Sequence, residues 1–173
     1  VRNLQKAAKA ICDHHEGVFP RDYDEIRALP GIGKYTAGAV ASFAYNDSKP
    51  IVDANVARVF SRLFDYQERV DSTAGEKQLW SWAEELVHGK KAREYNSAIM
   101  ELGQTYCSNK SPKCPECPTQ SFCNTKAPED LPRKKPKRST VLVDQFCFFT
   151  VNSKQEVLLS QEAAGQRREG MWK

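Results

Sequence analysis

The sequence predicts a mainly α-helical chain that leads into a cysteine-rich loop, a linker and the beginning of a β-containing domain. Apolar residues recur at helical spacing through residues 1–106. Four cysteines lie close together in residues 107–123. Residues 124–139 hold three prolines and a basic run, which is typical of a linker, and residues 140–173 begin with a segment rich in Val and Phe.

Two short helices are expected at the start of the chain. The residues that fall at helical spacing in the first are Val1, Leu4, Ala8, Ile11 and His15. Gly17 follows as a stop signal. Asp22, with Glu25 three residues later, resembles a capping box that opens a second helix ending before Pro30.

Four further helices are predicted before the cysteines. The small apolar segment from Tyr35 to Ala44 is consistent with a tightly packed helix. Thr73, with Glu76, caps a helix that ends at Gly89. The positions that mark the other two helices are Val56, Val59, Phe60 and Leu63, and then Tyr95, Ile99, Leu102 and Tyr106.

The segment after residue 140 has the pattern of a hairpin. Val141 to Val151 reads as a strand, Asn152 and Ser153 offer a turn, and Val157 to Leu159 reads as the returning strand.

Composition excludes several classes of protein. No stretch approaches the roughly 18 apolar residues of a membrane span, and nothing resembles a signal peptide. Six cysteines without such a signal argue against a disulfide framework and for a reducing compartment inside the cell, either the bacterial cytoplasm or the nucleus or mitochondrion. Cys12 and Cys147 lie far from the other four and are interpreted as small buried hydrophobes. The chain begins at Val1 and stops at Lys173 in the middle of a pattern, so we interpret it as part of a longer protein.

The four clustered cysteines carry the most specific signal. Their spacing is C-x6-C-x2-C-x5-C, at Cys107, Cys114, Cys117 and Cys123. Zinc sites usually combine two well-separated C-x2-C pairs, and only one such pair exists here. A cuboidal [4Fe–4S] cluster needs four thiolates supplied by one short loop, so this spacing favours the cluster over zinc or a metal-free loop.

The same loop is basic. Lys110 and Lys113 lie between the first two cysteines. A loop stiffened by proline and pinned by a metal can present lysines at fixed positions, for which phosphate is the expected counterpart. The alternative is that these lysines only solubilise the loop.

A glycine-rich turn separates the second and third predicted helices. It reads Leu29-Pro30-Gly31-Ile32-Gly33, with glycines that permit φ values closed to other residues and an isoleucine that can pack inward. The following helix opens at Lys34, and free N–H groups at such a terminus bind phosphate. Lys34 and Thr36 strengthen the prediction of a helix-hairpin-helix grip on DNA over that of an ordinary turn.

Asp53 is placed at the start of the helix that contains Val56. Its simplest role is that of an N-cap. A capped aspartate is also held rigidly and stays ionised, and such a carboxylate is what a sugar cation would need beside it. Both roles are compatible.

These motifs, in this order, resemble the iron–sulfur DNA glycosylases. Residues 29–38 and 53–58 are similar to the MutY family of adenine DNA glycosylases, and the resemblance covers nearly the whole chain. In the related endonuclease III family a lysine, which forms a Schiff base, stands where this chain has Tyr35. The resemblance therefore implies a glycosylase that removes the base without cutting the strand. The segment from residue 140 resembles the start of the Nudix-like domain that recognises 8-oxoguanine.

The resemblance also implies roles for single residues. The enzyme would flip adenine out of a mispair with 8-oxoguanine or guanine in double-stranded DNA. Asp53 matches the aspartate that stabilises the sugar cation, and Tyr35 and Asn55 match residues that position the sugar and that aspartate. The general acid of the family is a glutamate on an earlier helix, which would lie upstream of Val1, so this chain alone is not expected to excise adenine. A monomer is expected.

Three alternatives stay open at this point. The chain could belong to a related glycosylase with another base specificity, such as an endonuclease III-like or a thymine or uracil mismatch enzyme. It could be a non-catalytic module that only grips DNA. It could also be a zinc protein.

Overall fold

The computed structural model describes residues 1–87, 89–136, 139–144, 146, 148–166 and 168–172. They belong to two compact units, Val1–Pro136 and Lys137–Lys173. The described part of the chain is mainly α-helical, as the sequence predicts.

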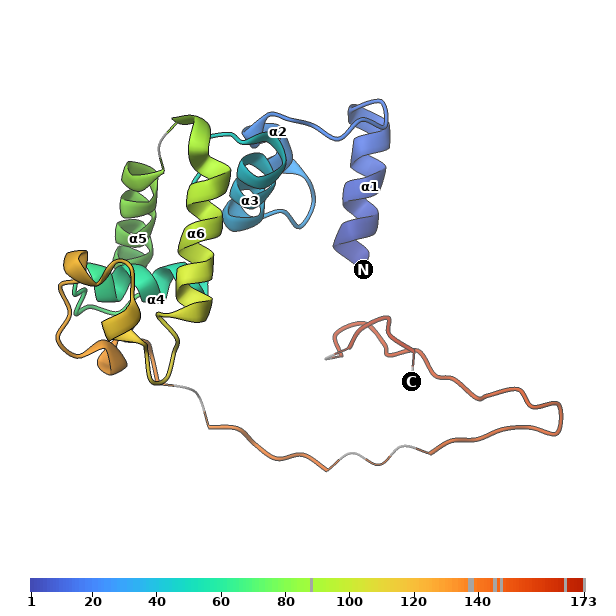
Figure 1. Cartoon of the computed structure of the whole chain (residues 1–173). Coiled ribbons are helices and arrows are strands. Elements are labelled where there is room, and N and C mark those ends of the chain that lie inside the picture. The colour runs from blue at the N-terminus through green and yellow to red at the C-terminus, as the bar shows by residue number, and fades with distance from the viewer. Residues whose placement is uncertain (88, 137–138, 145, 147, 167, 173) are drawn as a thin grey trace. The chain divides into compact units, whose positions relative to one another are not determined.

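The first unit is built from helices joined by short connections. In chain order these are α1 (Arg2–His14), α2 (Tyr23–Ala28), α3 (Lys34–Tyr45), α4 (Ala54–Leu63), α5 (Thr73–Leu86) and α6 (Ala92–Thr105), with short 3-10 turns η1 (Gly89–Lys91), η2 (Cys114–Glu116), η3 (Gln120–Phe122) and η4 (Pro128–Asp130). Helix α2 packs on α3, α3 packs on α6, and α4 contacts both α5 and α6 near their ends (Figure 1). In the ranges described above, no helix has the length and apolar character needed to cross a membrane.

Side-chain caps fix where the helices begin. The Asp22 carboxylate accepts hydrogen bonds from the N–H groups of Asp24 at 2.9 Å and Glu25 at 3.1 Å, which starts α2 as expected. The predicted cap of α5 is wrong by one residue. Ser72, rather than Thr73, accepts the bond from the Gly75 N–H at 3.0 Å, because the Ser72 backbone is still extended while Thr73 is already helical.

The main apolar core lies around α4. It joins this helix to α5 and to the segment that precedes α4, and its buried members are Ile51, Val56, Ala57, Phe60, Val70, Leu79 and Ala83. A second, smaller cluster of Ile26, Ala37 and Ala41 holds α2 against α3. The two clusters therefore fix the turn between α2 and α3, and the start of α4, in one rigid unit.

Helix α1 has the predicted length but not the predicted burial. Leu4 is 76% exposed, and Ala7 is the only α1 residue that is buried. Cys12 is exposed, so its interpretation as a buried hydrophobe is wrong. The reason is that no described segment covers this face of the helix. Cys147 lies outside the described residues.

The beginning of the predicted linker is a docked segment. Leu131 is 2% exposed, and the carbonyl of Arg133 accepts a bond from the Val70 N–H at 3.0 Å. Asp71 accepts from the backbone N–H of Lys135 at 2.9 Å and pairs with Arg69 at 3.0 Å. The bond from Arg69, followed by that from Lys135, lowers the pKa of the Asp71 carboxyl.

The second unit contains a turn but no strand within its described residues. The Asn152 side chain accepts bonds from the N–H groups of Lys154 at 2.9 Å and Glu156 at 3.0 Å, at the predicted turn. Two isolated bridges follow, Val151 with Val157 and Gln161 with Trp172. The apolar side chains of this segment are exposed, and a two-stranded ribbon without a packed face is marginal in water. The Nudix-like domain therefore stays a prediction.

Gly38 controls how closely α3 approaches the segment before α4. A Cβ at this position would collide with the carbonyl oxygen of Pro50. We expect Gly38→Ala to lower the free energy of unfolding by roughly 1–3 kcal/mol, because the backbone must move to accommodate the methyl group. Gly33→Ala is the control, since a Cβ there meets nothing within 4 Å. The stabilities of the two variants are compared by thermal unfolding. An equal loss of stability in both would contradict the packing argument.

Candidate functional site

The turn between α2 and α3 is closed by local hydrogen bonding and anchored by one side chain. The N–H of Ile32 donates to the carbonyl of Leu29 at 3.1 Å, and Gly31 has φ +84°, a conformation that favours glycine. Ile32 packs against the cluster of Ile26, Ala37 and Ala41, so it acts as the expected inward anchor.

Gly33 differs from what the sequence predicts. Its φ is −93° and its ψ is 175°, an extended conformation that any residue can adopt, so its backbone does not require glycine. A Cβ at Gly33 would meet open space. The fold itself therefore gives no reason for glycine at this position, whereas a ligand that approaches the backbone closely would give one.

The first turn of α3 presents N–H groups without a side-chain cap. Gly33 is the N-cap, and it provides no side-chain acceptor. The first N–H groups of an α-helix also have no intrahelical partner. Thr36 is exposed in this turn, and Tyr35 is 37% exposed. Free N–H groups of this kind bind anions at other helix N-termini, so this terminus is a candidate anion site.

Lys34 turns away from this terminus toward α5. Its Nζ lies 3.2 Å from a carboxylate oxygen of Glu84 and 4.0 Å from the ring centroid of Trp80. The side chain that the sequence assigns to DNA thus has two partners within the protein. Its contribution to the anion site comes from its backbone N–H.

Asp53 caps α4 and is held by two hydrogen bonds. One carboxylate oxygen accepts from the Val56 N–H at 2.7 Å, and the other accepts from the side-chain amide of Asn55 at 3.2 Å. The segment before Asp53 is fixed by Ile51, which is 1% exposed, and by the contact of Pro50 with Gly38. Since Gly38 lies one turn after Tyr35 on α3, this contact connects the first half of α3 with the segment that leads to Asp53.

Arg58 extends the hydrogen bonds of Asp53 toward the cysteines. Its guanidinium donates to the Asn55 side-chain oxygen at 2.9 Å, to the Gly103 carbonyl at 2.6 Å and to the Cys107 carbonyl at 2.8 Å. Burial lowers the pKa of Arg58, and the charges of Cys107 and Asp53 partly oppose this effect. Sequence reasoning assigned no role to Arg58. The signal that could have indicated a role was the presence of an arginine among the apolar residues of α4.

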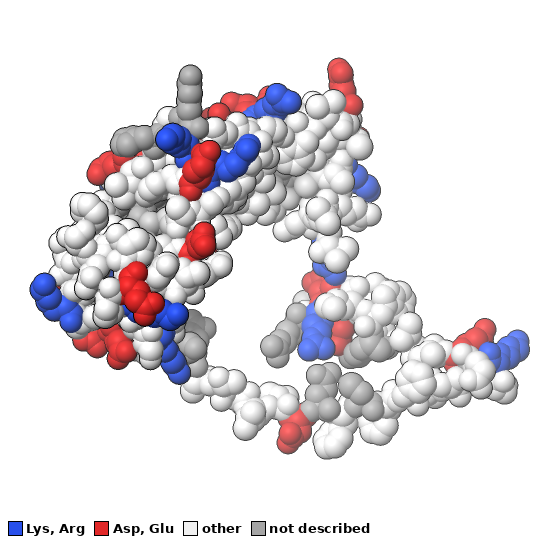
Figure 2. All heavy atoms as spheres, in the orientation of Figure 1, with Lys and Arg blue, Asp and Glu red and all other residues white. Residues whose placement is uncertain are grey.

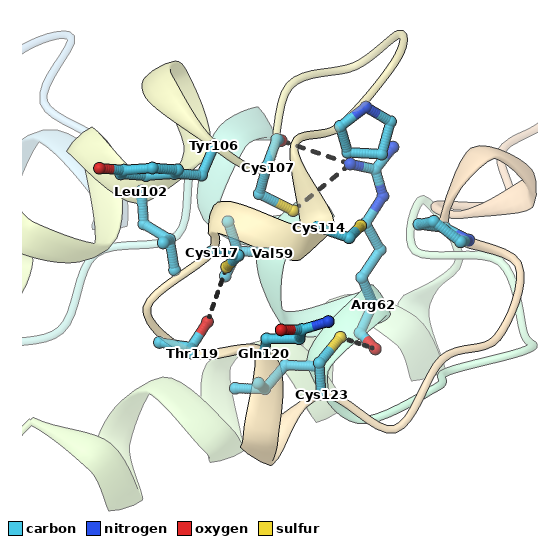
Figure 3. Close-up of a pocket in the computed structure, with 13 residues that line it drawn as sticks. Val59, Arg62, Leu102, Tyr106, Cys107, Cys114, Cys117, Thr119, Gln120 and Cys123 are labelled. Carbon is cyan, nitrogen blue, oxygen red and sulfur yellow. Dashed lines mark hydrogen bonds between the residues drawn. The ribbon is translucent and has the colours of Figure 1, made fainter.

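The four clustered cysteines line one pocket between α4, α6 and the loop after α6 (Figure 3). Apolar walls come from Val59, Leu102, Tyr106, Pro112 and Pro128. All four thiols are free, so the structure contains no disulfide among them. Burial, together with the charges of the other three cysteines, raises the pKa of the Cys123 thiol.

The arrangement of these thiols bears on the kind of metal group that fits. A tetrahedral zinc ion would draw the sulfurs to within about 4 Å of one another. Across the part of the chain that the structure describes, no three Cys, His, Asp or Glu side chains are gathered closely enough to hold a single ion. The four thiols that line this pocket are the candidate ligands for a metal group.

Lys110 and Lys113 are exposed on a loop whose backbone is fixed. The Ser108 hydroxyl donates to the carbonyls of Lys110 at 2.8 Å and Ser111 at 3.3 Å, and the Lys113 N–H donates to the carbonyl of Tyr106 at 2.9 Å. On the face shown in Figure 2, acidic and basic side chains are interspersed over the first unit rather than gathered by sign. Any phosphate contact on this face therefore depends on specific lysines and backbone N–H groups.

Known proteins share the glycine turn and the helical fold described above. A helix-hairpin-helix motif model matches residues 14–43, which contain α2, the glycine turn and most of α3. The chain is 35% identical to a thermostable thymine-DNA glycosylase of known structure, with a TM-score of 0.64, over 70% of this chain and 56% of that one. It is 31% identical to an endonuclease III solved as a trapped covalent intermediate with DNA, with a TM-score of 0.60, over 70% of this chain and 55% of that one.

Several adenine DNA glycosylases are similar to this chain in sequence. The human protein is 39% identical over 126 residues, which is 72% of this chain and 23% of the relative. That of Buchnera aphidicola is 33% identical over 175 residues, 99% of this chain and 48% of the relative. The chain thus spans between about a quarter and a half of the length of these relatives. The chain belongs to the adenine DNA glycosylase (MutY) family, within the helix-hairpin-helix glycosylase superfamily.

Proposed function

We propose that the protein containing this chain is a monofunctional DNA glycosylase of base excision repair, which removes adenine mispaired with 8-oxoguanine or guanine by hydrolysing the N-glycosidic bond. The observation that carries this proposal is the Asp53 carboxylate, which two hydrogen bonds fix at the start of α4. A fixed negative charge stabilises an oxocarbenium-like sugar as the bond to the base breaks.

The other residues of the site position the substrate. The turn from Pro30 to Gly33, with the N–H groups of the first turn of α3, binds the backbone of a double-stranded DNA substrate. Asn55 orients the carboxylate through its 3.2 Å hydrogen bond, and Tyr35 contacts the flipped nucleotide. Tyr35 carries no amine, and Lys34 is engaged by Glu84, which supports base removal without a Schiff base.

The cysteine pocket holds a [4Fe–4S] cluster through Cys107, Cys114, Cys117 and Cys123. When bound, the cluster pins the loop that presents Lys110 and Lys113 to phosphate. The second unit is the start of a Nudix-like domain that recognises 8-oxoguanine. The compartment is intracellular and reducing, and the glycosylase acts as a monomer.

A second candidate is a glycosylase of the same superfamily that acts on another base. The specific observation in its favour is the likeness to a thymine-DNA glycosylase at 35% identity. Duplexes that carry adenine opposite 8-oxoguanine, or thymine or uracil opposite guanine, separate the two candidates by the base released.

Asp53→Asn tests the catalytic role. Asparagine caps a helix as well as aspartate does, so the fold is expected to persist while the negative charge is lost. We expect base release from an adenine:8-oxoguanine duplex to slow by roughly 10²-fold or more, with mismatch binding retained. Because the general acid is expected upstream of Val1, the assay uses the longer protein.

The matched control is Asp22→Asn, which makes the same change at the cap of α2 and should leave activity unchanged. If base release survives in Asp53→Asn, the catalytic assignment is wrong and a non-catalytic DNA-binding module becomes the better interpretation.

Gly33→Ala tests the backbone approach of phosphate. The methyl group would occupy the open space in front of the α3 terminus, so we expect affinity for duplex DNA to fall roughly 10-fold, the equivalent of one charge-assisted hydrogen bond. An unchanged melting temperature shows that the fold is intact. Unaltered affinity would argue against the hairpin as a phosphate site.

The salt dependence of DNA binding tests the two loop lysines. Each phosphate contact by a cation contributes about 0.9 to the slope of log K against log salt concentration. We expect the double variant Lys110→Gln/Lys113→Gln to lower that slope by about 1.8. The control is Lys77→Gln/Lys91→Gln, which removes two exposed lysines outside the loop. Equal slopes for both variants would mean that the loop lysines only solubilise the protein.

Metal analysis tests the cofactor. Protein purified without oxygen should be brown and contain about four iron atoms and four sulfide ions per chain, as a [4Fe–4S] cluster requires. Zinc in place of iron, at one ion per chain, would contradict the proposal and support the zinc alternative.

A further inference from the structure

Arg62 is the largest of the fully buried side chains in the described residues, with 1% of its surface exposed. Its guanidinium reaches from α4 into the cysteine pocket (Figure 3). It donates to the backbone carbonyls of Ser108 at 2.7 Å, Leu131 at 3.1 Å, Cys107 at 3.3 Å and Asn109 at 3.3 Å. One further contact, at 3.3 Å, is to the sulfur of Cys107.

This buried charge has no carboxylate partner among its hydrogen bonds. The ion pairs found in the described residues are Lys34 with Glu84 and Arg69 with Asp71. An arginine cannot lose its proton in a protein, so it stays charged where it is buried. A buried charge without a counter-charge is strongly destabilising. The one atom in contact with Arg62 that can carry a full negative charge is the sulfur of Cys107.

A second guanidinium, that of Arg58, increases the need for a negative charge at Cys107. Arg58 donates to the same Cys107 carbonyl that Arg62 contacts, at 2.8 Å. The Asp53 carboxylate offsets part of the Arg58 charge, and its hydrogen-bond link to Arg58 runs through Asn55. The positive charge at Cys107 therefore exceeds what the local carboxylates offset.

We propose that Arg62 is a positioning residue for the iron–sulfur cluster and carries the positive charge that balances it. This inference rests on the cofactor proposed above. Four thiolates and the cluster core carry a net negative charge, and one added electron increases it. A guanidinium that donates to a ligand sulfur therefore favours the reduced cluster and raises its reduction potential.

Arg62 also connects both ends of the cysteine loop with the linker. Its side chain contacts Cys107, the first cysteine, while its own backbone carbonyl accepts from the Thr125 N–H at 3.2 Å, just after Cys123, the last cysteine. The same guanidinium holds the carbonyl of Leu131. Loading of the cluster should therefore stabilise the loop and the docked start of the linker together.

The test compares three variants in protein that is loaded with the cluster. Arg62→Gln removes the charge, Arg62→Lys keeps the charge but loses the forked geometry, and Arg27→Gln removes an exposed arginine on α2 as the control. We expect both Arg62 variants to lose iron to a chelator roughly 10–100-fold faster than wild type, as for other residues that support metal ligands. The reduction potential should fall in Arg62→Gln and stay closer to wild type in Arg62→Lys.

A measurement on wild type covers the case in which the Arg62 variants do not fold. Removal of the cluster should speed trypsin cleavage after Arg133 and Lys134. The Arg62 guanidinium, which holds the Leu131 carbonyl of the linker, then loses its counter-charge. Equal cleavage rates with and without the cluster would overturn the coupling to the linker.

Two further kinds of outcome would contradict different proposals. An unchanged potential in Arg62→Gln, or equal shifts in the Gln and Lys variants, would overturn the counter-charge role while leaving the cofactor proposal intact. Wild-type protein without iron would overturn the cofactor proposal, and this inference with it.

Discussion

The structure depends on α4, because one helix holds both the carboxylate and the base of the cysteine loop. Asp53 caps its first turn, and Arg58 and Arg62 project from its buried side. Asp53 and Arg62 are nine residues apart, or about 14 Å along the axis. A helix packed into the main core does not bend easily over that distance, so a shift of the loop at one end is transmitted to the carboxylate at the other.

Arg58 and Arg62 are unusual residues for the buried side of a helix such as α4. A helix buried on this side would normally present apolar residues, and a buried guanidinium is costly unless its donors are satisfied. Here the donors meet backbone carbonyls of the loop and of α6, and no buried side-chain nitrogen or oxygen in the described residues lacks a partner. Apart from that of Gly103 in α6, these carbonyls belong to segments without regular structure, where the arginines replace the hydrogen bonds that a helix or sheet would provide.

Local features of this chain could be predicted from the sequence, whereas features that depend on distant partners could not. The caps at Asp22 and Asp53, and the left-handed Gly31, follow from neighbouring residues. The orientation of Lys34 depends on Glu84, fifty residues later, and the role of Arg62 depends on Leu131. Periodicity likewise predicts that α1 has an apolar face but cannot say whether anything covers it.

The position of one lysine also explains how similar scaffolds can support different chemistry. Successive residues on an α-helix point about 100° apart, so Lys34 and Tyr35 cannot face the same site. Lys34 faces α5, where Glu84 pairs with its charge and Trp80 covers it. A lysine one residue later would instead stand where Tyr35 does and would offer an amine to the nucleotide. Substitution of the single residue at position 35 would thus change whether a scaffold of this kind offers an amine or a phenol there.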